Sequence, residues 1–383
     1  MGRLNPLTRA DGAGDRLREP NMPGNEDRRG AAMTLGQQKA RHASTTAAAE
    51  KEHVLITGGL GFIGTHVADG YLAAGHRVSL LDSMVAAVTD GAWYRGNPNV
   101  TIIRESVEAY FAAGGTLAPY DRVIHAASHV GPAGILKYAG RLGFAIVDAT
   151  HQMIEACLKE DKPLCTFSSA ETYGRSGDLA EGDTIEVPMP YSARIEYAIA
   201  KTLTECMLAN SIQRGLRAIA IRPFNVTGPR QSKAGGFVMP TFVQQGLMGQ
   251  PMTVFHTGEQ TRAFLSAVDL TRFLVEFMDK ALASGQQVFN VGNPANRITV
   301  RALADHINAR LGNPSTVVYA DAKKIHGALY EEAVSIHKTP VIDRARALGW
   351  EPRVDLDALV DETIDFYRQH EDMRARELAR SAA

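Results

Sequence analysis

The chain has 383 residues, of which 45% are hydrophobic and 22% are charged, a composition typical of a globular protein with a sizeable core. Its 41 basic and 42 acidic residues give a net charge of -1, which does not indicate a nucleic-acid partner or a membrane-surface partner. No apolar run in the sequence is long enough to cross a bilayer.

Residues 1–51 have a different composition from the rest of the chain. They are rich in Arg, Gly and Ala and show no apolar periodicity, so we predict a disordered N-terminal tail. The tail lacks the apolar core of a signal peptide, and both Met1 and Met33 remain possible starts.

Cys157, Cys165 and Cys206 lack the spacing of a disulfide framework or a metal site. We therefore expect reduced core thiols, a cytoplasmic location and no metal.

The first ordered segment reads as a dinucleotide-binding unit. "HVLIT" is a short strand, "GGLGFIG" is a glycine-rich turn, and "THVADGYLAAG" is a helix. Glycines let the backbone approach a pyrophosphate, and the helix N-terminus supplies free N–H groups. The next strand ends at Asp82, whose carboxylate we expect to bind an adenosine ribose and to favour NAD over NADP. The predicted cofactor contacts of the turn are Gly58, Gly61, Phe62, Ile63 and Gly64.

Short apolar runs then alternate with helical patterns. The runs are "VTIIR", "RVIHAA", "LCTFSS" and "LRAIAIR", with helices expected notably at residues 135–159 and 195–213. This alternation predicts an α/β fold with a Rossmann-type, doubly wound parallel sheet over residues 52–225, which carries the cofactor and the catalytic residues. Residues 226–383 are less regular and include two amphipathic helical patterns. We predict that they form mainly a smaller, substrate-binding α/β lobe.

The segment "EYAIAK" places Tyr197 and Lys201 four residues apart, on one face of a helix. A tyrosine ordinarily ionises near pH ~10, but a nearby ammonium group and a positive nicotinamide ring favour the phenolate. Tyr197 can then remove a proton from a sugar hydroxyl while the carbon gives a hydride to NAD. Ser169 can hydrogen-bond the same hydroxyl. By spacing alone, an ordinary pair on a helix surface remains open.

Seven motifs occur in order between about His53 and His370: "TGGLGFIG", "HAAS", "SSAETYG", "YAIAK", "RPFNVTGPRQ", "GEQTRAF" and "LGWEP". In these motifs the chain resembles the extended short-chain dehydrogenases/reductases of the nucleotide-sugar epimerase/dehydratase/decarboxylase group. The resemblance implies an NAD-dependent enzyme that acts on a nucleotide sugar. It also implies a homodimer formed through paired helices, one of which carries Tyr197.

The resemblance also assigns roles to individual residues. It makes Ser169, Tyr197 and Lys201 the catalytic set, with Tyr197 and Lys201 also at the cofactor. It places Ala126 and Ala127 under the cofactor, Pro223 and Asn225 along the nicotinamide and sugar diphosphate, and Arg262 on a substrate phosphate. Arg194 matches an arginine that decarboxylases can carry and that would contact substrate, although a solvated helix charge fits as well.

Glu171 and Ala170 bear on the reaction. Members of this group oxidise a sugar hydroxyl, usually at C4, and then epimerise, dehydrate or decarboxylate. A carboxylate two residues after the catalytic Ser is typical of dehydratases and decarboxylases, but dehydratases also tend to have an Asp at the position of Ala170, which cannot donate a proton. We therefore expect a catalytic Glu171 in a decarboxylase of a nucleotide-linked glucuronic acid, with UDP the favoured nucleotide.

Other functions remain open at this point. The closest rival is a 4-epimerase of a nucleotide hexose or hexuronate, followed by a 4,6-dehydratase. A carbonyl reductase and a non-catalytic NAD-binding module are further alternatives. The sequence does not identify the nucleotide, the sugar or the pathway.

Overall fold

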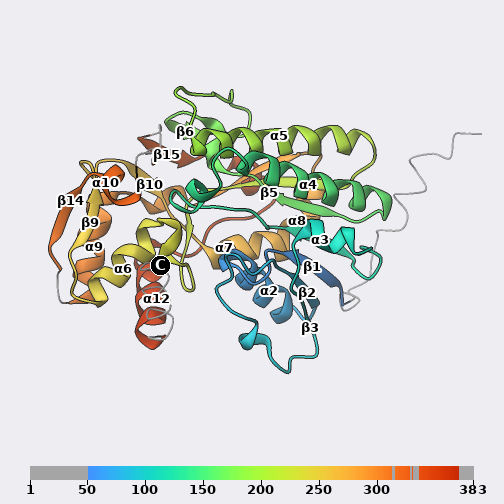
Figure 1. The fold of residues 1–383 in the computed structure, drawn as a ribbon, viewed down its shortest axis with the longest axis horizontal. Helices are drawn as coiled ribbons and strands as arrows, with labels where there is room; N and C mark the ends of the chain where they lie inside the picture. The colour runs from blue at the N-terminus through green and yellow to red at the C-terminus, as the bar shows by residue number, and fades with distance from the viewer. Residues whose placement is uncertain (1–50, 313–314, 328–329, 331–335, 371–383) are drawn as a thin grey trace, which may run out of the picture. The chain divides into compact units, whose positions relative to one another are not determined.

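A seven-stranded, all-parallel sheet forms the centre of the fold, in the order β12-β7-β5-β4-β1-β2-β3 (Figure 1). The computed structural model describes residues 51–312, 315–327, 330 and 336–370, so the predicted tail lies outside the described residues except for Lys51. The strands are β1 (His53–Thr57), β2 (Arg77–Leu81), β3 (Val100–Ile103), β4 (Arg122–His125), β5 (Leu164–Phe167), β7 (Ala218–Pro223) and β12 (Val288–Val291). The strand order runs outward in both directions from the β1–β4 pair, which confirms the doubly wound prediction.

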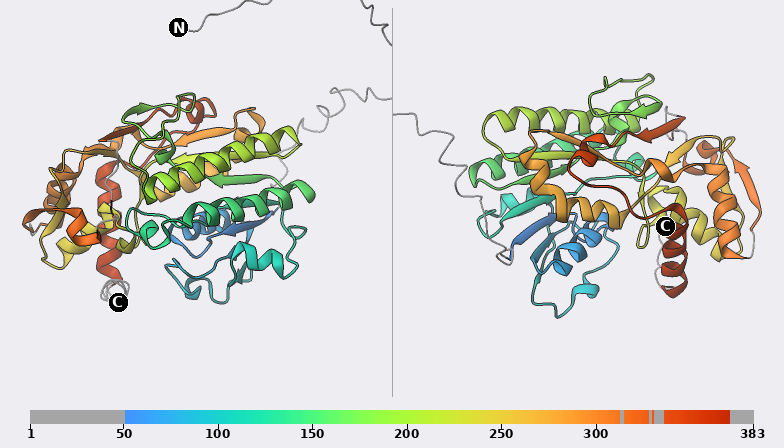
Figure 2. Two further views of the ribbon diagram at one scale, coloured as in Figure 1. Left: turned by 45° about the horizontal axis from the view of Figure 1, so that its top comes forward. Right: turned by 180° about the vertical axis from the view of Figure 1, so that it is seen from behind.

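Helices cover both faces of this sheet (Figure 2). One face packs against α3 (Val107–Ala112), α4 (Leu142–Lys159) and α5 (Ala193–Gln213). The other packs against α2 (Phe62–Ala73), α7 (Ala267–Arg272), α8 (Met278–Ala283) and α11 (Asp343–Ala347). Alternation along β1 explains the two layers, because Val54 and Ile56 enter one core and Leu55 enters the other.

A smaller lobe adds a third core. In it α6 (Val238–Leu247), α9 (Val300–Leu311) and α12 (Leu356–Gln369) pack together beside the parallel pair β9 (Met252–Phe255) and β14 (Val317–Ala320). Both predicted amphipathic helices are confirmed as α9 and α12. The short helix α10 (Ala322–His326) follows β14. No helix in the described ranges combines the length and apolar character needed to span a membrane.

Two small sheets connect the lobe to the central sheet. A four-stranded sheet has the order β13 (Arg297–Thr299), β10 (Thr261–Ala263), β15 (His337–Pro340) and β6 (Gly177–Leu179). A two-stranded sheet pairs β11 (Leu265–Ser266) with β8 (Val226–Thr227). Short helical turns are η2 (Ala92–Tyr94), η3 (Gly134–Tyr138), η4 (Ala170–Tyr173), η5 (Lys233–Gly235), η6 (Phe273–Phe277, a π-turn) and η7 (Pro294–Asn296).

The structure differs from the sequence predictions in three places. Residues 288–291 lie beyond the predicted boundary at residue 225, yet as β12 they form the edge strand beside β7. The predicted helix over residues 135–159 is interrupted between η3 and α4, where Gly140 takes a left-handed φ of 84°. Cys157 and Cys165 are buried, but Cys206 is exposed, so the expectation of a core thiol is wrong for Cys206.

Candidate active site

The glycine-rich turn links β1 to α2 and lies against β2. Gly58 has a left-handed φ of 66°, and its N–H donates to Leu81 O at 2.8 Å. A Cβ on Gly64 would lie 2.1 Å from Gly58 O, so only glycine lets the helix pack this closely on the turn. Gly61 caps α2 without a side-chain hydrogen bond, and the N–H groups of Phe62 and Ile63 belong to the first turn, where a helix offers its N–H groups no intrahelical acceptor. This donor set fits a pyrophosphate.

The backbone after β4 forms a floor beside this turn. Ala126 N and Ala127 N donate to Thr57 O at 3.2 Å and to Thr57 Oγ1 at 3.1 Å. A Cβ on Gly58 would lie 3.0 Å from Ala127 Cα, so the two segments are already in contact. The structure therefore places the predicted small residues directly against the glycine-rich turn.

Asp82 follows β2 and is buried. Its carboxylate accepts hydrogen bonds from Leu60 N at 3.0 Å and from Met84 N at 2.8 Å. The side chain is thus fixed against the glycine-rich turn, at the edge where an adenosine ribose would bind. The ribose contact itself stays a prediction.

Helix α5 carries three of the predicted site residues. The Ser192 hydroxyl caps the helix by accepting from Ile195 N, and Arg194, Tyr197 and Lys201 follow on buried or half-buried positions. Lys201 Nζ donates to Phe167 O at 2.7 Å and lies 5.8 Å from the centroid of the Tyr197 ring. Tyr197 and Lys201 are both buried, so they are not an ordinary surface pair.

Burial dominates the acid–base behaviour of this pair. It lowers the pKa of Lys201 to about 8, against the opposing charge of Glu205. It raises the pKa of Tyr197 well above the usual tyrosine range, opposed by a hydrogen bond from Ser169 and reinforced by the charge of Glu171. This direction is opposite to the lowered pKa of Tyr197 that its spacing from Lys201 predicts. In the chain by itself, desolvation and the charge of Glu171 outweigh the hydrogen bond from Ser169, so ionisation of Tyr197 depends on further positive charge.

Ser168 and Ser169, which follow β5, have different hydrogen-bond partners. Ser169 Oγ accepts from Glu171 N at 3.1 Å and caps η4, while its hydroxyl lies within hydrogen-bond reach of Tyr197. Ser168 Oγ donates to the Glu205 carboxylate instead. Only Ser169 is therefore available to a substrate hydroxyl beside Tyr197.

Glu171 lies in a cluster of cations. Its Oε1 is 2.7 Å from Lys338 Nζ and 3.1 Å from Arg194 Nη1. Burial works to raise the pKa of Glu171, but Lys338 and Arg194 outweigh it and hold that pKa far below the usual range, so the carboxylate stays ionised. Burial lowers the pKa of Lys338 to about 8, with Glu171 opposing the shift. Arg194 is mostly buried and ion-paired, which excludes the solvated-charge interpretation.

Lys338 was not predicted from the sequence. It reaches the site because β15 lies between β10 and β6, with Lys338 in register with Arg262 on one side and with Gly177 on the other. Glu171, Arg194 and Lys338 line one small cavity together. The segment "HKTP" carries no motif of its own, so only the strand pairing reveals its lysine as a site residue.

The remaining predicted substrate contacts border the same cluster. Arg262 Nη1 donates to Thr261 O at 2.8 Å, and the Arg262 charge acts on both Glu171 and Lys338. Asn225 follows Pro223 at the end of β7 and donates through Nδ2 to Ala263 O at 3.1 Å. The end of β7 is thereby tied to the strand that carries Arg262.

A doubly wound sheet with a glycine-rich turn after β1, and with Ser, Tyr and Lys at the carboxyl edge, defines an NAD-binding enzyme of the short-chain dehydrogenase/reductase type. Residues 54–292 match the model of the NAD dependent epimerase/dehydratase family. The chain belongs to this family, and its cofactor is NAD.

Two curated relatives are similar to this chain over most of its length. The "UDP-N-acetyl-alpha-D-glucosaminuronate decarboxylase" of Bacillus cytotoxicus is 27% identical, over 84% of this chain and 99% of the relative. The "UDP-glucuronic acid decarboxylase 1" of Xenopus tropicalis is also 27% identical, over 84% of this chain and 73% of the relative.

Among solved structures, the UDP-N-acetylglucosamine 4-epimerase from Methanobrevibacter ruminantium, in complex with UDP-N-acetylmuramic acid, is similar at a TM-score of 0.72. It has 25% identity and covers 84% of this chain and 99% of its own. The UDP-glucuronic acid 4-epimerase from Bacillus cereus, in complex with UDP-glucuronic acid and NAD, has a TM-score of 0.70 at 22% identity, over 83% of this chain and 99% of its own. At 22% identity, the similarity to the Bacillus cereus enzyme shows a shared fold alone.

Proposed function

We propose that this chain is an NAD-dependent decarboxylase of a nucleotide-linked glucuronic acid, with UDP the favoured nucleotide. The observation that carries the proposal is the cation cluster around Glu171. Lys338 and Arg194 both pair with this one carboxylate, and Arg262 lies close enough to act on it. Three cations thus surround one carboxylate and supply ammonium and guanidinium donors of the kind that bind a sugar carboxylate or a diphosphate.

The chemistry begins at the sugar C4 hydroxyl. Tyr197 removes the hydroxyl proton as C4 loses a hydride, while Ser169 hydrogen-bonds the same oxygen. When bound beside the glycine-rich turn, NAD would supply the hydride acceptor for this oxidation and the hydride donor for the later reduction. Lys201 lies beside the Tyr197 ring and, while protonated, favours the phenolate form of Tyr197. These three residues account for oxidation of the sugar to its 4-ketone.

A ketone at C4 is beta to the C6 carboxylate. The C5–C6 bond can then break, with its electron pair entering the C4 carbonyl and CO2 leaving. A proton added at C5 gives the 4-keto pentose, and return of the hydride to C4 gives the pentose. Ala170, at the position where elimination of water would need an acid, is buried and cannot donate a proton, which favours loss of CO2 over dehydration.

A 4-epimerase is the second candidate. The likeness to the Methanobrevibacter ruminantium 4-epimerase favours it, at 25% identity and a TM-score of 0.72. A product screen by mass separates the two, with purified protein incubated with UDP-, dTDP- and GDP-linked sugars and uronates. Decarboxylation predicts a product lighter than its uronate by one CO2, whereas an isomer of unchanged mass would replace our proposal with epimerisation.

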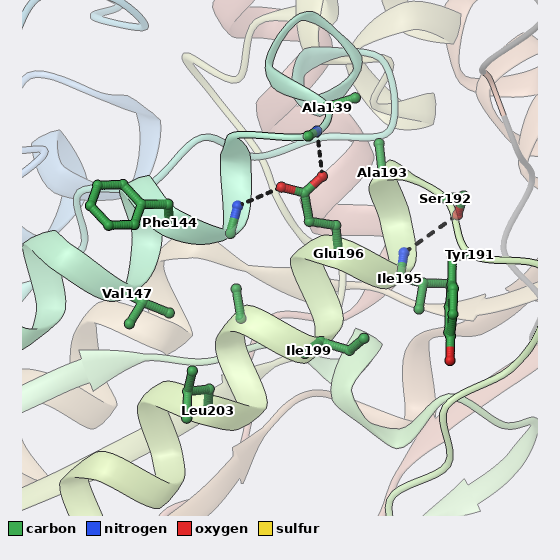
Figure 3. A pocket seen from close by; sticks show the side chains of 13 residues that line it. Ala139, Phe144, Val147, Tyr191, Ser192, Ala193, Ile195, Glu196, Ile199 and Leu203 are labelled. Atoms are coloured by element: carbon green, nitrogen blue, oxygen red, sulfur yellow. Dashed lines mark hydrogen bonds between the residues drawn. The ribbon is translucent and has the colours of Figure 1, made fainter.

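We also propose that two copies of the chain pair through α4 and α5. An apolar groove runs along these helices, with Phe144 and Val147 on one side and Ile199 and Leu203 on the other (Figure 3). Phe144 is 77% exposed, an unusual position for a large apolar side chain within a contiguous apolar groove. The family resemblance implies a homodimer formed through paired helices, one of which carries Tyr197 and is therefore α5. Light scattering should show a dimer for the native chain and a monomer for Phe144→Asp, and a native monomer would refute the pairing.

A cytoplasmic location remains part of the proposal. It is supported by the three cysteines, all of which are free. Fractionation of the producing cell, followed by detection of the chain with an antibody, tests it, and recovery outside the cytoplasm would contradict it.

A further inference from the structure

Glu205 is a buried carboxylate that the proposed reaction does not use. It lies one helical turn after Lys201 on α5. Arg222 donates to it twice, from Nε to Oε1 at 2.8 Å and from Nη2 to Oε2 at 2.6 Å. The Ser168 hydroxyl also donates to Oε1. Three charge-assisted hydrogen bonds therefore converge on this one side chain.

These contacts join the three elements on which the catalytic groups stand. Ser168 lies between Phe167, whose carbonyl accepts the Lys201 ammonium group at 2.7 Å, and the catalytic Ser169. Arg222 directly precedes Pro223 at the end of β7. The Glu205 carboxylate on α5 thus holds the end of β5 just before Ser169. It also holds the end of β7 just before Pro223, which is predicted to line the nicotinamide.

Arg222 is held from its other side as well. Its guanidinium lies 4.6 Å from the centroid of the Tyr173 ring, and the Tyr173 hydroxyl donates to Asn290 Oδ1 at 2.8 Å. Tyr173 belongs to η4, which Ser169 caps. The network therefore runs from β12 to the catalytic helix, and Glu205 supplies the negative charge that pairs with Arg222.

We infer that Glu205 is a positioning residue that places a negative charge one helical turn from Lys201 and fixes Ser168, and through it Ser169, against the catalytic helix. The inference holds for any reaction that begins with Tyr197 and Lys201, so it does not depend on which sugar is the substrate. The hydrogen bonds of the Glu205 carboxylate go to Ser168 and Arg222, so its role is positioning and not catalysis.

The charges around Lys201 support this role. Burial lowers the pKa of Lys201 to about 8, and Glu205 is the neighbouring charge that opposes the shift. From β4, His125 faces Lys201 as a neutral group, because burial lowers its pKa to about 3. Tyr197 shares the helix with Lys201, and Arg222 is the ion-pair partner of Glu205. Without Glu205, the pKa of Lys201 should fall further, and the ammonium form should be lost at lower pH.

The test compares three variants of the full chain loaded with NAD. Glu205→Gln removes the charge and leaves Arg222 unpaired, which should also destabilise the fold. The double variant Glu205→Gln with Arg222→Met removes both buried charges and should recover much of the thermal stability. Glu205→Asp keeps the negative charge. Titration of Lys201 by NMR, assigned with Lys201→Met, gives a readout that needs no substrate.

We expect the Lys201 titration to move to lower pH by about one unit in Glu205→Gln and in the double variant, and to stay near its native position in Glu205→Asp. The alkaline limb of turnover, measured with the substrate that the product screen identifies, should shift in the same direction. If the double variant recovers both stability and the native Lys201 titration, Glu205 is only structural and the inference is wrong. Failure of the decarboxylase proposal would leave the NMR titration unaffected.

Discussion

Lys338, which is buried, and Glu171, which is half-buried, form an ion pair with 2.7 Å between Nζ and Oε1, although β15 and η4 are far apart in the sequence. The pairing of β15 with β10 and β6 brings the lysine to the carboxylate. Glu171 is therefore an ionised, fixed group and not a free base. Any account of the reaction has to treat Glu171, Lys338 and Arg194 as one charged unit.

Removing the charge of Glu171 should separate the two halves of the reaction. In Glu171→Gln we expect oxidation at C4 to persist, because Ser169, Tyr197 and Lys201 stay in place. We expect CO2 release to fall by about a hundredfold or more, because Lys338 and Arg194 lose the charge that holds them in position. Reduced nicotinamide, followed by absorbance in single turnovers, reports the first step, and released CO2 reports the second. Glu155→Gln, which removes an exposed partner of Arg214, is the matched control. Unchanged CO2 release in Glu171→Gln would show that our interpretation of Glu171 is wrong.

Removing the positive charge of Lys338 should weaken recognition of a uronate selectively. We expect Lys338→Met to lose roughly tenfold or more in affinity for UDP-glucuronate, with a smaller loss for UDP-glucose, because a charge-assisted hydrogen bond contributes about 1.5–3 kcal/mol. Calorimetry on the NAD-loaded protein measures both affinities. Lys338→Arg retains the charge and should preserve the preference. Equal losses for both ligands would mean that Lys338 serves Glu171 alone.

The two pairings of Glu171 should also appear in the pH dependence of stability. The folded pKa of Glu171 lies below its ordinary value of 4.5, so its ionised form stabilises the fold above that pH, and this contribution is lost as the pH falls from 4.5 toward the folded pKa. The difference in free energy of unfolding between the native chain and Glu171→Gln should therefore be largest near neutral pH and shrink in acid. Urea titrations at several pH values measure it. A difference that grew in acid would contradict the ion-pair assignment.

A methyl group on Gly64 should disrupt the cofactor turn. Its Cβ would lie 2.1 Å from Gly58 O, so Gly64→Ala should force α2 away from the turn, destabilise the fold by roughly 1–3 kcal/mol and abolish retention of NAD. Thermal unfolding and the cofactor content of the purified protein report the two effects. Gly182→Ala is the control, because its Cβ would meet no atom within 4 Å. Full NAD retention in Gly64→Ala would argue against this turn as the pyrophosphate site.

The sequence sufficed for the parts of the site that depend on local pattern. The turn around Gly58 and Gly64 has a strict backbone requirement, and Tyr197 and Lys201 share a helix face by spacing, so both could be placed before the fold was known. Lys338 could not be found in this way, because its role depends on which strands flank β15.

Other differences between the sequence predictions and the structure also arise from contacts between elements that are distant in the sequence. The local pattern of residues 288–291 does not reveal that they pair with β7, so the predicted boundary at residue 225 separates β12 from its own sheet. The buried pair of Glu205 and Arg222 joins a helix to a strand and has no signature within either element alone. The raised pKa of Tyr197 follows from burial, which the spacing of Tyr197 and Lys201 does not reveal.

The most direct test of the proposed activity follows one carbon atom. UDP-glucuronate labelled with carbon-13 at C6 is incubated with the NAD-loaded protein, and both the released gas and the sugar product are analysed by mass. Our account predicts labelled CO2 and an unlabelled UDP-pentose or its 4-keto form. Label that stays in the sugar, in a product of unchanged mass, would contradict decarboxylation and assign the site to epimerisation.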